Sequence, residues 1–271
     1  MHKSVFPGVS LIVSTYNWPE ALNLCLLSIS KQQVLPDEVI IADDGSAEET
    51  KNLIAQYQQS FPIPLIHVWQ EDNGFQLSKI RNKAMAKASR EYIVQIDGDL
   101  ILEKSFIREH LEFRLHRTFV SGTRVNMSAE LSEKLINKSS IAVNVFSKGI
   151  TNFLNGLKIP PLTSFLAKKY KAGNLSYVRG CNMAFWKADL LKVNGYNEEI
   201  VGWGREDSEL AIRLMNAGIS KRIIKFAAVT FHIYHSETPR VRLSVNDEIL
   251  NDTLKSRIKK CKLGISQYLQ D

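Results

Sequence analysis

The sequence lacks several features that would place a protein in a special class. Its three cysteines, Cys25, Cys181 and Cys261, are far apart and odd in number, which excludes a disulfide scaffold and fits a reducing compartment. No apolar run approaches the roughly 18–20 residues that a membrane-spanning helix needs. The N-terminus has no basic segment followed by a long apolar stretch and a cleavage site. We therefore expect a cytoplasmic protein.

Disorder is excluded as well, because 44% of the 271 residues are hydrophobic, an ordinary fraction for a globular protein. Lysine and arginine number 35 against 28 aspartates and glutamates, which gives a net charge of +7. This surplus favours an anionic partner, such as a nucleotide, a nucleic acid or a membrane surface. We expect no nucleic-acid partner, because the positive charge is dispersed and no recognition fold is visible.

Strand and helix patterns alternate through residues 1–120. Buried strands are predicted at 9–14, 38–42, 65–69 and 92–96, and helices at 18–33, 47–60 and 77–89. Such repeats predict an α/β fold, with a parallel sheet that is flanked by helices on both faces. Polar clusters at 14–17, 43–46 and 97–99 follow three strand ends, so we expect them to meet at the ligand-binding edge of the sheet.

The remaining chain divides into three parts. Residues 121–175 lose the regular pattern and form an insertion or acceptor lid that is partly apolar and basic. Regular patterns return in 176–240. Strands are predicted at 177–185 and 222–231, and helices at 187–193 and from the end of the segment 202–207 to residue 217. In 241–271, an amphipathic helical tail places Ile249, Leu254, Ile258, Cys261 and Ile265 on one stripe. The insertion and the tail could rest on an anionic membrane surface, or serve as a flexible lid and a packing helix.

Two carboxylates one residue apart, Asp97 and Asp99, follow the predicted strand at 92–96. Alone, such a triplet also suits a turn. Beside other carboxylates at equivalent strand ends, it favours Mg²⁺ or Mn²⁺, which prefer oxygen ligands. His232 and His235 lie three apart after another strand pattern, and neutral imidazole is a good Mn²⁺ ligand beside carboxylates.

Other polar residues allow a structural and a functional interpretation. Asp43 and Asp44 suit a turn and a helix cap, or a carboxylate that accepts hydrogen bonds from a base or a ribose. Arg81 is either a solvated helical charge or a phosphate or base contact. Glu206 and Asp207 begin a predicted helix after Gly202-Trp203-Gly204. They are either acidic residues of a helix N-terminus, where the helix dipole favours their ionised form, or they provide a general base.

Taken together, the segments 10–17, 43–46, 81–82 and 97–99 resemble the nucleotide-binding half of the family-2 inverting glycosyltransferases. The segments 179–185 and 202–207 resemble the acceptor half that is shared by β-1,4-galactosyltransferases, polypeptide N-acetylgalactosaminyltransferases and chondroitin-polymerase-like enzymes. The resemblance covers about residues 8–117 and 176–236. It implies a GT-A-type mixed sheet and a C-terminal acceptor-binding half.

The resemblance also implies residue roles on the donor side. Thr15, Tyr16 and Asp44 would hold uridine, with Asp43 nearby and Arg81 assisting. Asp97 would contact the ribose or the donor sugar. Asp99 would bind Mn²⁺ or Mg²⁺ with one histidine, for which His235 is favoured and His232 is the alternate.

On the acceptor side, Asp207 matches the catalytic base, Glu206 would orient the acceptor and Trp203 would stack on a sugar. Arg205 departs from the commoner Gly-Gly-Glu-Asp run and could recognise an anionic acceptor group.

The implied activity is transfer of a sugar from a UDP-sugar to a hydroxyl of a glycan or lipid-linked glycan, with inversion, in bacterial surface polysaccharide or lipopolysaccharide synthesis. The protein would act in the cytoplasm or at the inner face of the membrane. A nucleotidyltransferase is disfavoured because no glycine-rich phosphate loop lies near the N-terminus. A non-catalytic binding module is disfavoured because Asp99, Asp207 and both histidines are present.

Overall fold

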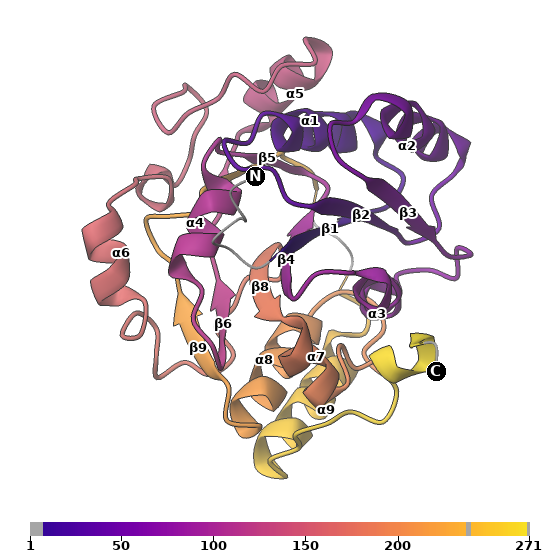
Figure 1. Ribbon diagram of the computed structural model, residues 1–271, viewed down its shortest axis with the longest axis vertical. Helices are drawn as coiled ribbons and strands as arrows, with labels where there is room; N and C mark the ends of the chain where they lie inside the picture. The colour runs from indigo at the N-terminus through magenta and orange to yellow at the C-terminus, as the bar shows by residue number, and fades with distance from the viewer. Residues whose placement is uncertain (1–7, 237–239, 270–271) are drawn as a thin grey trace, which may run out of the picture.

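The computed structural model describes residues 8–236 and 240–269, and in these ranges the strands form two sheets (Figure 1). The larger sheet has the order β3-β2-β1-β4-β8-β6-β9 and the smaller one β5-β10-β7. The strands are β1 Val9–Thr15, β2 Glu38–Asp43, β3 Leu65–Trp69, β4 Tyr92–Asp97, β5 Leu100–Leu102, β6 Thr118–Ser121, β7 Val125–Asn126, β8 Asn182–Trp186, β9 Ser220–Ile223 and β10 Thr230–His232. The helices are α1 Pro19–Ser30, α2 Glu48–Ser60, α3 Leu77–Lys87, α4 Phe106–Phe113, α5 Ala129–Asn137, α6 Pro160–Leu166, α7 Lys187–Val193, α8 Glu206–Asn216 and α9 Leu243–Lys255, with 3₁₀ turns η1 Phe153–Asn155 and η2 Ile265–Tyr268.

The larger sheet separates two hydrophobic layers because its side chains alternate between the two faces. Leu11 and Val13 of β1 pack in one layer with Leu22 and Leu26 of α1. Ile12, between them, packs in the other layer, which holds apolar side chains of α3, α7 and α8. Helices therefore cover both faces, as Figure 1 shows. The predicted mixed sheet flanked by helices is confirmed, with β1 to β4 mutually parallel and β8 antiparallel to β4.

Strand register brings the polar clusters to one edge. Thr15 is paired with Asp43 across β1 and β2, and Ser14 is paired with Asp97 across β1 and β4. Three strands thus end at the same level, where β5 and β10 of the smaller sheet add Leu100 and His232 as a registered pair. The expected convergence at the carboxyl edge of the sheet is therefore confirmed.

Two predicted strands of the second half are wrong in extent. The strand predicted at 177–185 begins only at Asn182, and the preceding residues form a loop. The strand predicted at 222–231 is two strands in different sheets, since β9 pairs with β6 and β10 pairs with β5 and β7. Local hydrophobicity cannot separate these cases, because long-range pairing decides which backbone groups join a ladder.

The tail is also shorter as a helix than predicted. Helix α9 ends at Lys255, and Ile258, Cys261 and Ile265 lie outside it. Cys261 and Ile265 are buried, and Ile265 joins the hydrophobic layer formed by α3, α7 and α8. The tail therefore uses these apolar side chains for internal packing rather than as one exposed stripe.

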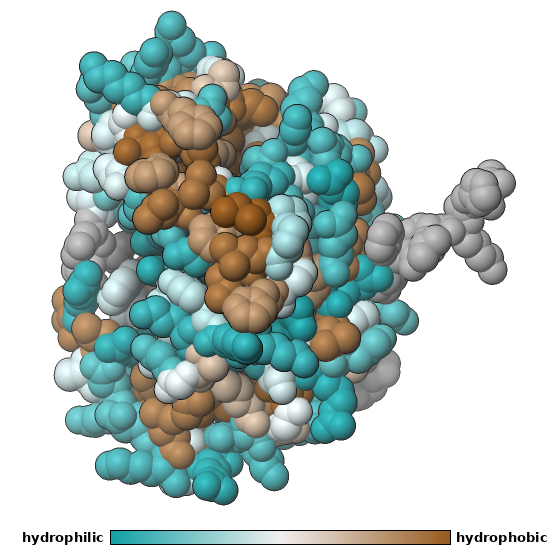
Figure 2. Space-filling model, turned by 90° about the vertical axis from the view of Figure 1, so that its left-hand side faces the viewer, coloured by the Kyte–Doolittle hydropathy of each residue, from teal (hydrophilic) through white to brown (hydrophobic). Residues whose placement is uncertain are grey.

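The segment of residues 138–175 lies at the rim of the molecule, with α6 on the outside (Figure 1). Figure 2 views the molecule from this side and shows hydrophobic side chains gathered on the surface. Within residues 8–236 and 240–269, every helix is too short or too polar to serve as a membrane-spanning segment. The predicted division of the chain into four parts stays a prediction.

Candidate active site

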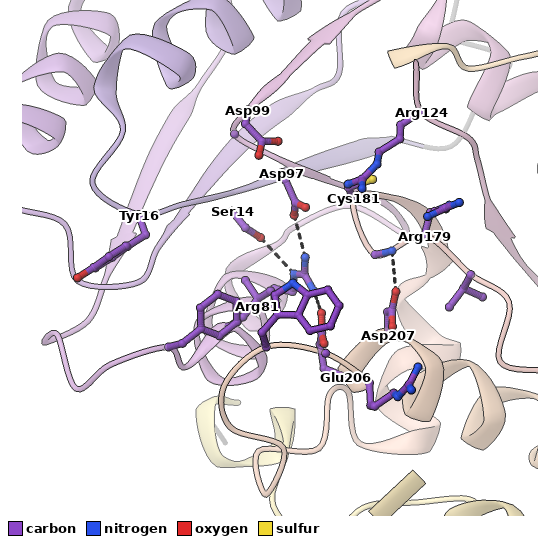
Figure 3. A pocket seen from close by; sticks show the side chains of 18 of the residues that line it. Ser14, Tyr16, Arg81, Asp97, Asp99, Arg124, Arg179, Cys181, Glu206 and Asp207 are labelled. Atoms are coloured by element: carbon purple, nitrogen blue, oxygen red, sulfur yellow. Dashed lines mark hydrogen bonds and ion pairs between the residues drawn. The ribbon is translucent and has the colours of Figure 1, made fainter. Parts of the chain in front are cut away.

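A cavity of about 940 Å³ lies beyond the carboxyl ends of β1 and β4 (Figure 3). Its volume suits a ligand larger than a single sugar. Every residue predicted for the site lines it except Asp43: Thr15, Tyr16, Asp44, Arg81, Asp97, Asp99, Trp203, Arg205, Glu206, Asp207, His232 and His235. The structure thus brings together side chains from both halves of the chain.

Arg81 connects the two halves beneath this cavity. Only 1% of Arg81 is exposed, so its charge needs partners. Its Nε donates to Ser14 Oγ at 3.2 Å, its Nη2 to Asp97 Oδ1 at 2.9 Å and its Nη1 to Glu206 Oε1 at 3.2 Å. All three nitrogens therefore contact protein groups, which differs from the solvated helical charge considered above and indicates a positioning role.

Glu206 is the mostly buried partner on the acceptor side. Burial raises the pKa of Glu206 to about 7, with a further contribution from the neighbouring Asp207, while Arg81 opposes the shift. Its second oxygen, Oε2, is buried and has no hydrogen-bond partner among the residues that the structure describes. Glu206 is therefore able to exchange a proton near neutral pH or to accept a hydrogen bond from a ligand.

Asp44 is fixed at the end of β2 by two donors. Gln70 Nε2 donates to its Oδ1 at 2.6 Å, and the backbone nitrogen of Gln76 donates to its Oδ2 at 2.8 Å. Burial raises the pKa of Asp44 to about 6 in spite of these two hydrogen bonds. Close by, Tyr16 is half exposed and its hydroxyl donates to Asp72 Oδ2 at 2.8 Å.

Asp43 does not line the cavity itself but adjoins Asp44, which does. Its Oδ1 accepts from the backbone nitrogen of Ser46 at 2.8 Å, and its Oδ2 lies 2.9 Å from His67 Nε2. The side chain of Asp43 is fully buried. Of the two adjacent aspartates, Asp43 fixes the turn and Asp44 is presented to the cavity.

Asp99, His232 and His235 form a cluster that could hold a metal ion. Asp99 Oδ2 lies 3.3 Å from His232 Nε2 and 3.4 Å from His235 Nε2, and the potential ligand atoms all lie within 4.8 Å of one another. Burial works to raise the pKa of Asp99, but hydrogen bonds from both histidines outweigh it and hold that pKa well below its usual range. Both histidines are in place, so the favoured residue and its alternate share one site.

The remaining polar atoms of His235 and Asp99 also suit a bound cation. His235 Nδ1 lies 2.7 Å from the carbonyl oxygen of Ser236, which can only accept, so Nδ1 carries a proton. Release of the Nε2 proton that faces Asp99 would leave Nε2 able to bind a cation. Asp99 Oδ1 is buried without a hydrogen-bond partner in the described part of the chain. One carboxylate beside two imidazoles is a donor set that Mn²⁺ accepts.

Asp207 stands in the first turn of α8, and Figure 3 shows it across the cavity from Asp99. The backbone nitrogen of Gly180 donates to its Oδ2 at 2.8 Å, and the backbone nitrogen of Ser208 donates to its Oδ1 at 2.6 Å. A Cβ atom at position 180 would lie 3.2 Å from Oδ2, so glycine permits this close approach. The carboxylate is thereby held in one orientation at the cavity wall.

The loop before α8 is held by the tail helix. Asn246 of α9 is fully buried, and its Nδ2 donates to the carbonyl oxygens of Val201 at 3.2 Å and Gly204 at 3.0 Å. Arg205 pairs with Asp247 of the same helix. Its guanidinium therefore already has a carboxylate partner, which weakens the expectation that it recognises an anionic acceptor.

Among the cavity-lining residues that were given no role from the sequence are Arg124, Tyr177 and Arg179. The Arg179 guanidinium lies 5.7 Å from the centre of the Tyr177 ring. Arg179 stands in a segment that carries the family resemblance, beside Gly180, and that position was the available signal. Arg124 lies in a loop with no pattern, and Tyr177 lies in a loop that was predicted as the start of a strand, so only the folded chain reveals them.

The profile of glycosyl transferase family 2 matches residues 10–193. The chain belongs to this family. A second profile, that of the N-terminal domain of galactosyltransferase, matches residues 161–236. Both halves of the resemblance drawn from the sequence are therefore confirmed, and the family is one of glycosyltransferases.

Curated relatives include chondroitin synthase of Escherichia coli, 27% identical over 87% of this chain and 35% of the relative, and hyaluronan synthase of Pasteurella multocida, 28% identical over 86% and 25%. The chain thus spans about a quarter to a third of the length of these relatives.

Among solved structures, Staphylococcus aureus TarS in complex with UDP-GlcNAc matches with a TM-score of 0.66 at 16% identity, over 96% of this chain and 69% of the other. The mannosyltransferase PcManGT of Pyrobaculum calidifontis, in complex with GDP-Man and Mn²⁺, matches with a TM-score of 0.58 at 16% identity, over 93% and 70%. These likenesses show the fold, which is of the GT-A type.

Proposed function

We propose that the chain is a metal-dependent inverting glycosyltransferase that moves a sugar from a UDP-sugar to a hydroxyl of a glycan or lipid-linked glycan, in bacterial surface polysaccharide or lipopolysaccharide synthesis. The observation that carries this proposal is that Asp44, Asp99, His235 and Asp207 line one cavity. The names of the relatives, which include synthases of chondroitin and hyaluronan, support a glycan product. The complex of TarS with UDP-GlcNAc supports a uridine nucleotide donor.

On the donor side, the ionised carboxylate of Asp44 would accept a hydrogen bond from the uracil imide. Thr15 and Tyr16 would contact the rest of the nucleoside. Asp97, held by Arg81 at 2.9 Å, would accept a hydrogen bond from a hydroxyl of the ribose or of the donor sugar. Arg81 acts in this proposal by positioning Asp97, not by touching the donor.

Asp99, His232 and His235 would hold Mn²⁺ or Mg²⁺. When bound, such a cation stabilises negative charge on the departing nucleoside diphosphate. Arg124 lines the same part of the cavity and adds positive charge there, which preorganised sites use to stabilise developing anions.

On the acceptor side, Asp207 would remove the proton of the attacking hydroxyl. The hydroxyl oxygen forms a bond to the anomeric carbon while the bond to the diphosphate oxygen breaks, and attack from the opposite face inverts the configuration. Backbone donors fix the Asp207 carboxylate before the acceptor arrives, which favours proton transfer in one geometry. Trp203 and Glu206 would orient the acceptor sugar.

The test is a panel of nucleotide sugars in a thermal-shift assay, with and without Mn²⁺, followed by an assay of UDP release. We expect one UDP-sugar to stabilise the protein more than the others, because a ligand that binds only the native state raises its melting temperature. His235→Gln should reduce the part of the shift that depends on Mn²⁺. His116→Gln, a histidine stacked on Trp186 and outside the cavity lining, is the matched control.

Three outcomes would overturn the proposal. Diphosphate release from a nucleoside triphosphate would identify a nucleotidyltransferase. Binding of a UDP-sugar without turnover on any glycan would identify a binding module. Thermal stabilisation by a UDP-sugar that is the same with and without Mn²⁺ would contradict the proposed metal dependence.

A further inference from the structure

Five large apolar side chains are exposed on the rim segment that contains α6. The exposed fractions are 83% for Phe146, 49% for Phe153, 55% for Leu154, 39% for Ile159 and 61% for Phe165. We call these five residues the apolar face. Figure 2 shows that hydrophobic side chains on this side of the molecule gather in a band. Contiguous exposed apolar patches are rare on monomeric proteins and mark interaction sites.

The segment that carries the apolar face has charge of one sign. Between residues 139 and 180 the sequence has no aspartate or glutamate, and its basic residues are Lys148, Lys158, Lys168, Lys169, Lys171 and Arg179. The 28 acidic residues of the chain all lie outside this segment. Lys158 is paired with Glu103 and Glu109, which lie outside this segment, so the lysines that follow α6 carry the charge beside the apolar face. Positive charge beside apolar side chains attracts a partner that is both apolar and anionic.

The lysines and the apolar side chains are close enough to act together. Lys168, Lys169 and Lys171 are exposed and follow α6 directly. Lys169 Nζ lies 4.3 Å from the centre of the Phe165 ring, so a charge lies at the edge of the apolar face. Aromatic and aliphatic side chains flanked by lysines are typical of helices that lie in the interface of a membrane.

The apolar face does not serve the cavity of the active site. None of its five residues is among the residues that line that cavity, so closure over a sugar does not explain their exposure. Residues 174–180 of the same segment do contribute to the cavity lining, with Asn174 and Tyr177 among them. The segment therefore runs from an exposed apolar surface to the wall of the active site.

We propose that the apolar face and Lys168, Lys169 and Lys171 bind the surface of an anionic lipid bilayer. The phenylalanine and leucine side chains would lie at the level of the headgroups, and the lysines would contact lipid phosphates. Binding of this kind is peripheral. If the proposed function holds, it would bring the active site beside the bilayer, where a lipid-linked acceptor is presented.

The experiment is flotation of the full chain with vesicles of phosphatidylcholine alone and of equal parts phosphatidylcholine and phosphatidylglycerol, at low and high salt. We expect flotation with the anionic vesicles at low salt and much less with the neutral ones. The charge variant K168E/K169E should bind about thirtyfold more weakly or worse, since each lysine near an anionic surface contributes about 1 kcal/mol. The apolar variant F146S/F165S should also lose binding.

Matched controls come from the tail. K259E/K260E makes the same charge change at two exposed lysines, and L263S replaces a leucine that is 47% exposed; both should float like the wild type. Circular dichroism shows whether each variant is folded. UDP release with a soluble acceptor should be unchanged in all four variants, so failure of membrane binding and failure of the proposed function are distinguishable.

Absence of flotation with anionic vesicles would overturn the proposal. So would equal losses in K168E/K169E and K259E/K260E, which would indicate attraction by net charge alone. If sedimentation velocity instead shows a wild-type dimer that F146S/F165S converts to a monomer, the apolar face binds a second copy of the chain and the membrane proposal is wrong.

Discussion

Arg81→Met tests the connection between the two halves of the site. The change keeps an apolar side chain of similar length but removes the charge that faces Asp97 at 2.9 Å and Glu206 at 3.2 Å. Removing one partner of a buried ion pair costs about 3–5 kcal/mol. Because the Asp97 side chain is 32% exposed and that of Glu206 is 12% exposed, water partly screens the first loss. We expect a total loss of about 4 kcal/mol at pH 8.

This loss should depend on pH in a known direction. Glu206 has a pKa of about 7, above its ordinary value, so the folded state binds this proton more readily than the unfolded state. The resulting stability is present at low pH and is lost as pH rises through about 7. Without Arg81 the pKa of Glu206 rises further, and near pH 5.5 the carboxyl is neutral in both proteins. At pH 5.5 the stability lost in Arg81→Met should therefore fall to about 2 kcal/mol, which comes from the lost pair with Asp97 and from packing.

Urea unfolding followed by tryptophan fluorescence at pH 8 and pH 5.5 measures both values. Arg108→Met is the control, because Arg108 and Glu112 form an exposed pair, with side chains 44% and 49% exposed, and such pairs contribute at most about 1 kcal/mol. A deficit that is equal at the two pH values would refute the role assigned to Glu206. A deficit no larger than that of Arg108→Met would refute the buried bridge as a whole.

Three further changes test other parts of the site. Uridine should bind about tenfold more weakly for each pH unit below about 6, since Asp44 has a pKa of about 6 and must be ionised to accept a hydrogen bond; calorimetry would count against this if Asp44→Asn kept the same pH dependence. Asn246→Ala should cost about 1 kcal/mol, because two half-buried carbonyl oxygens lose their donor, and should raise the KM for the acceptor; an unchanged KM would mean that α9 does not position the loop. His232→Gln and His235→Gln should each weaken Mn²⁺ binding by about tenfold or more, measured by the paramagnetic resonance of free Mn²⁺, and unchanged affinity in both would contradict the cluster.

The sequence predicted the donor side of the fold better than the acceptor side. In the first 120 residues each polar cluster directly follows a buried strand, and parallel pairing then brings Thr15, Asp44 and Asp97 to one edge without further information. At Asp43 and Asp44 the local pattern allowed both a structural and a functional role. Which carboxylate faces the cavity depends on His67 and Ser46, which contact Asp43 from other elements.

On the acceptor side, long-range contacts decide the geometry. The sequence pattern predicts a strand for the loop before Asn182. In the structure Gly180 lies outside β8, and its backbone nitrogen donates to Asp207. No residue near Arg81 in the sequence predicts its contact with Glu206, which lies 125 residues further along the chain. Helix α9 was predicted, but its hold on the loop through Asn246 requires the folded chain.

The rate of sugar transfer by Asp207→Asn tests the central claim most directly. The change preserves the shape of the side chain and removes its ability to take a proton, so transfer should fall by about 10²–10⁴-fold while the thermal shift with UDP-sugar and Mn²⁺ is kept. Asp189→Asn provides the control, because Asp189 also lies in the first turn of a helix but outside the cavity lining. A transfer rate near that of the wild type in Asp207→Asn would contradict the proposal that this carboxylate activates the acceptor.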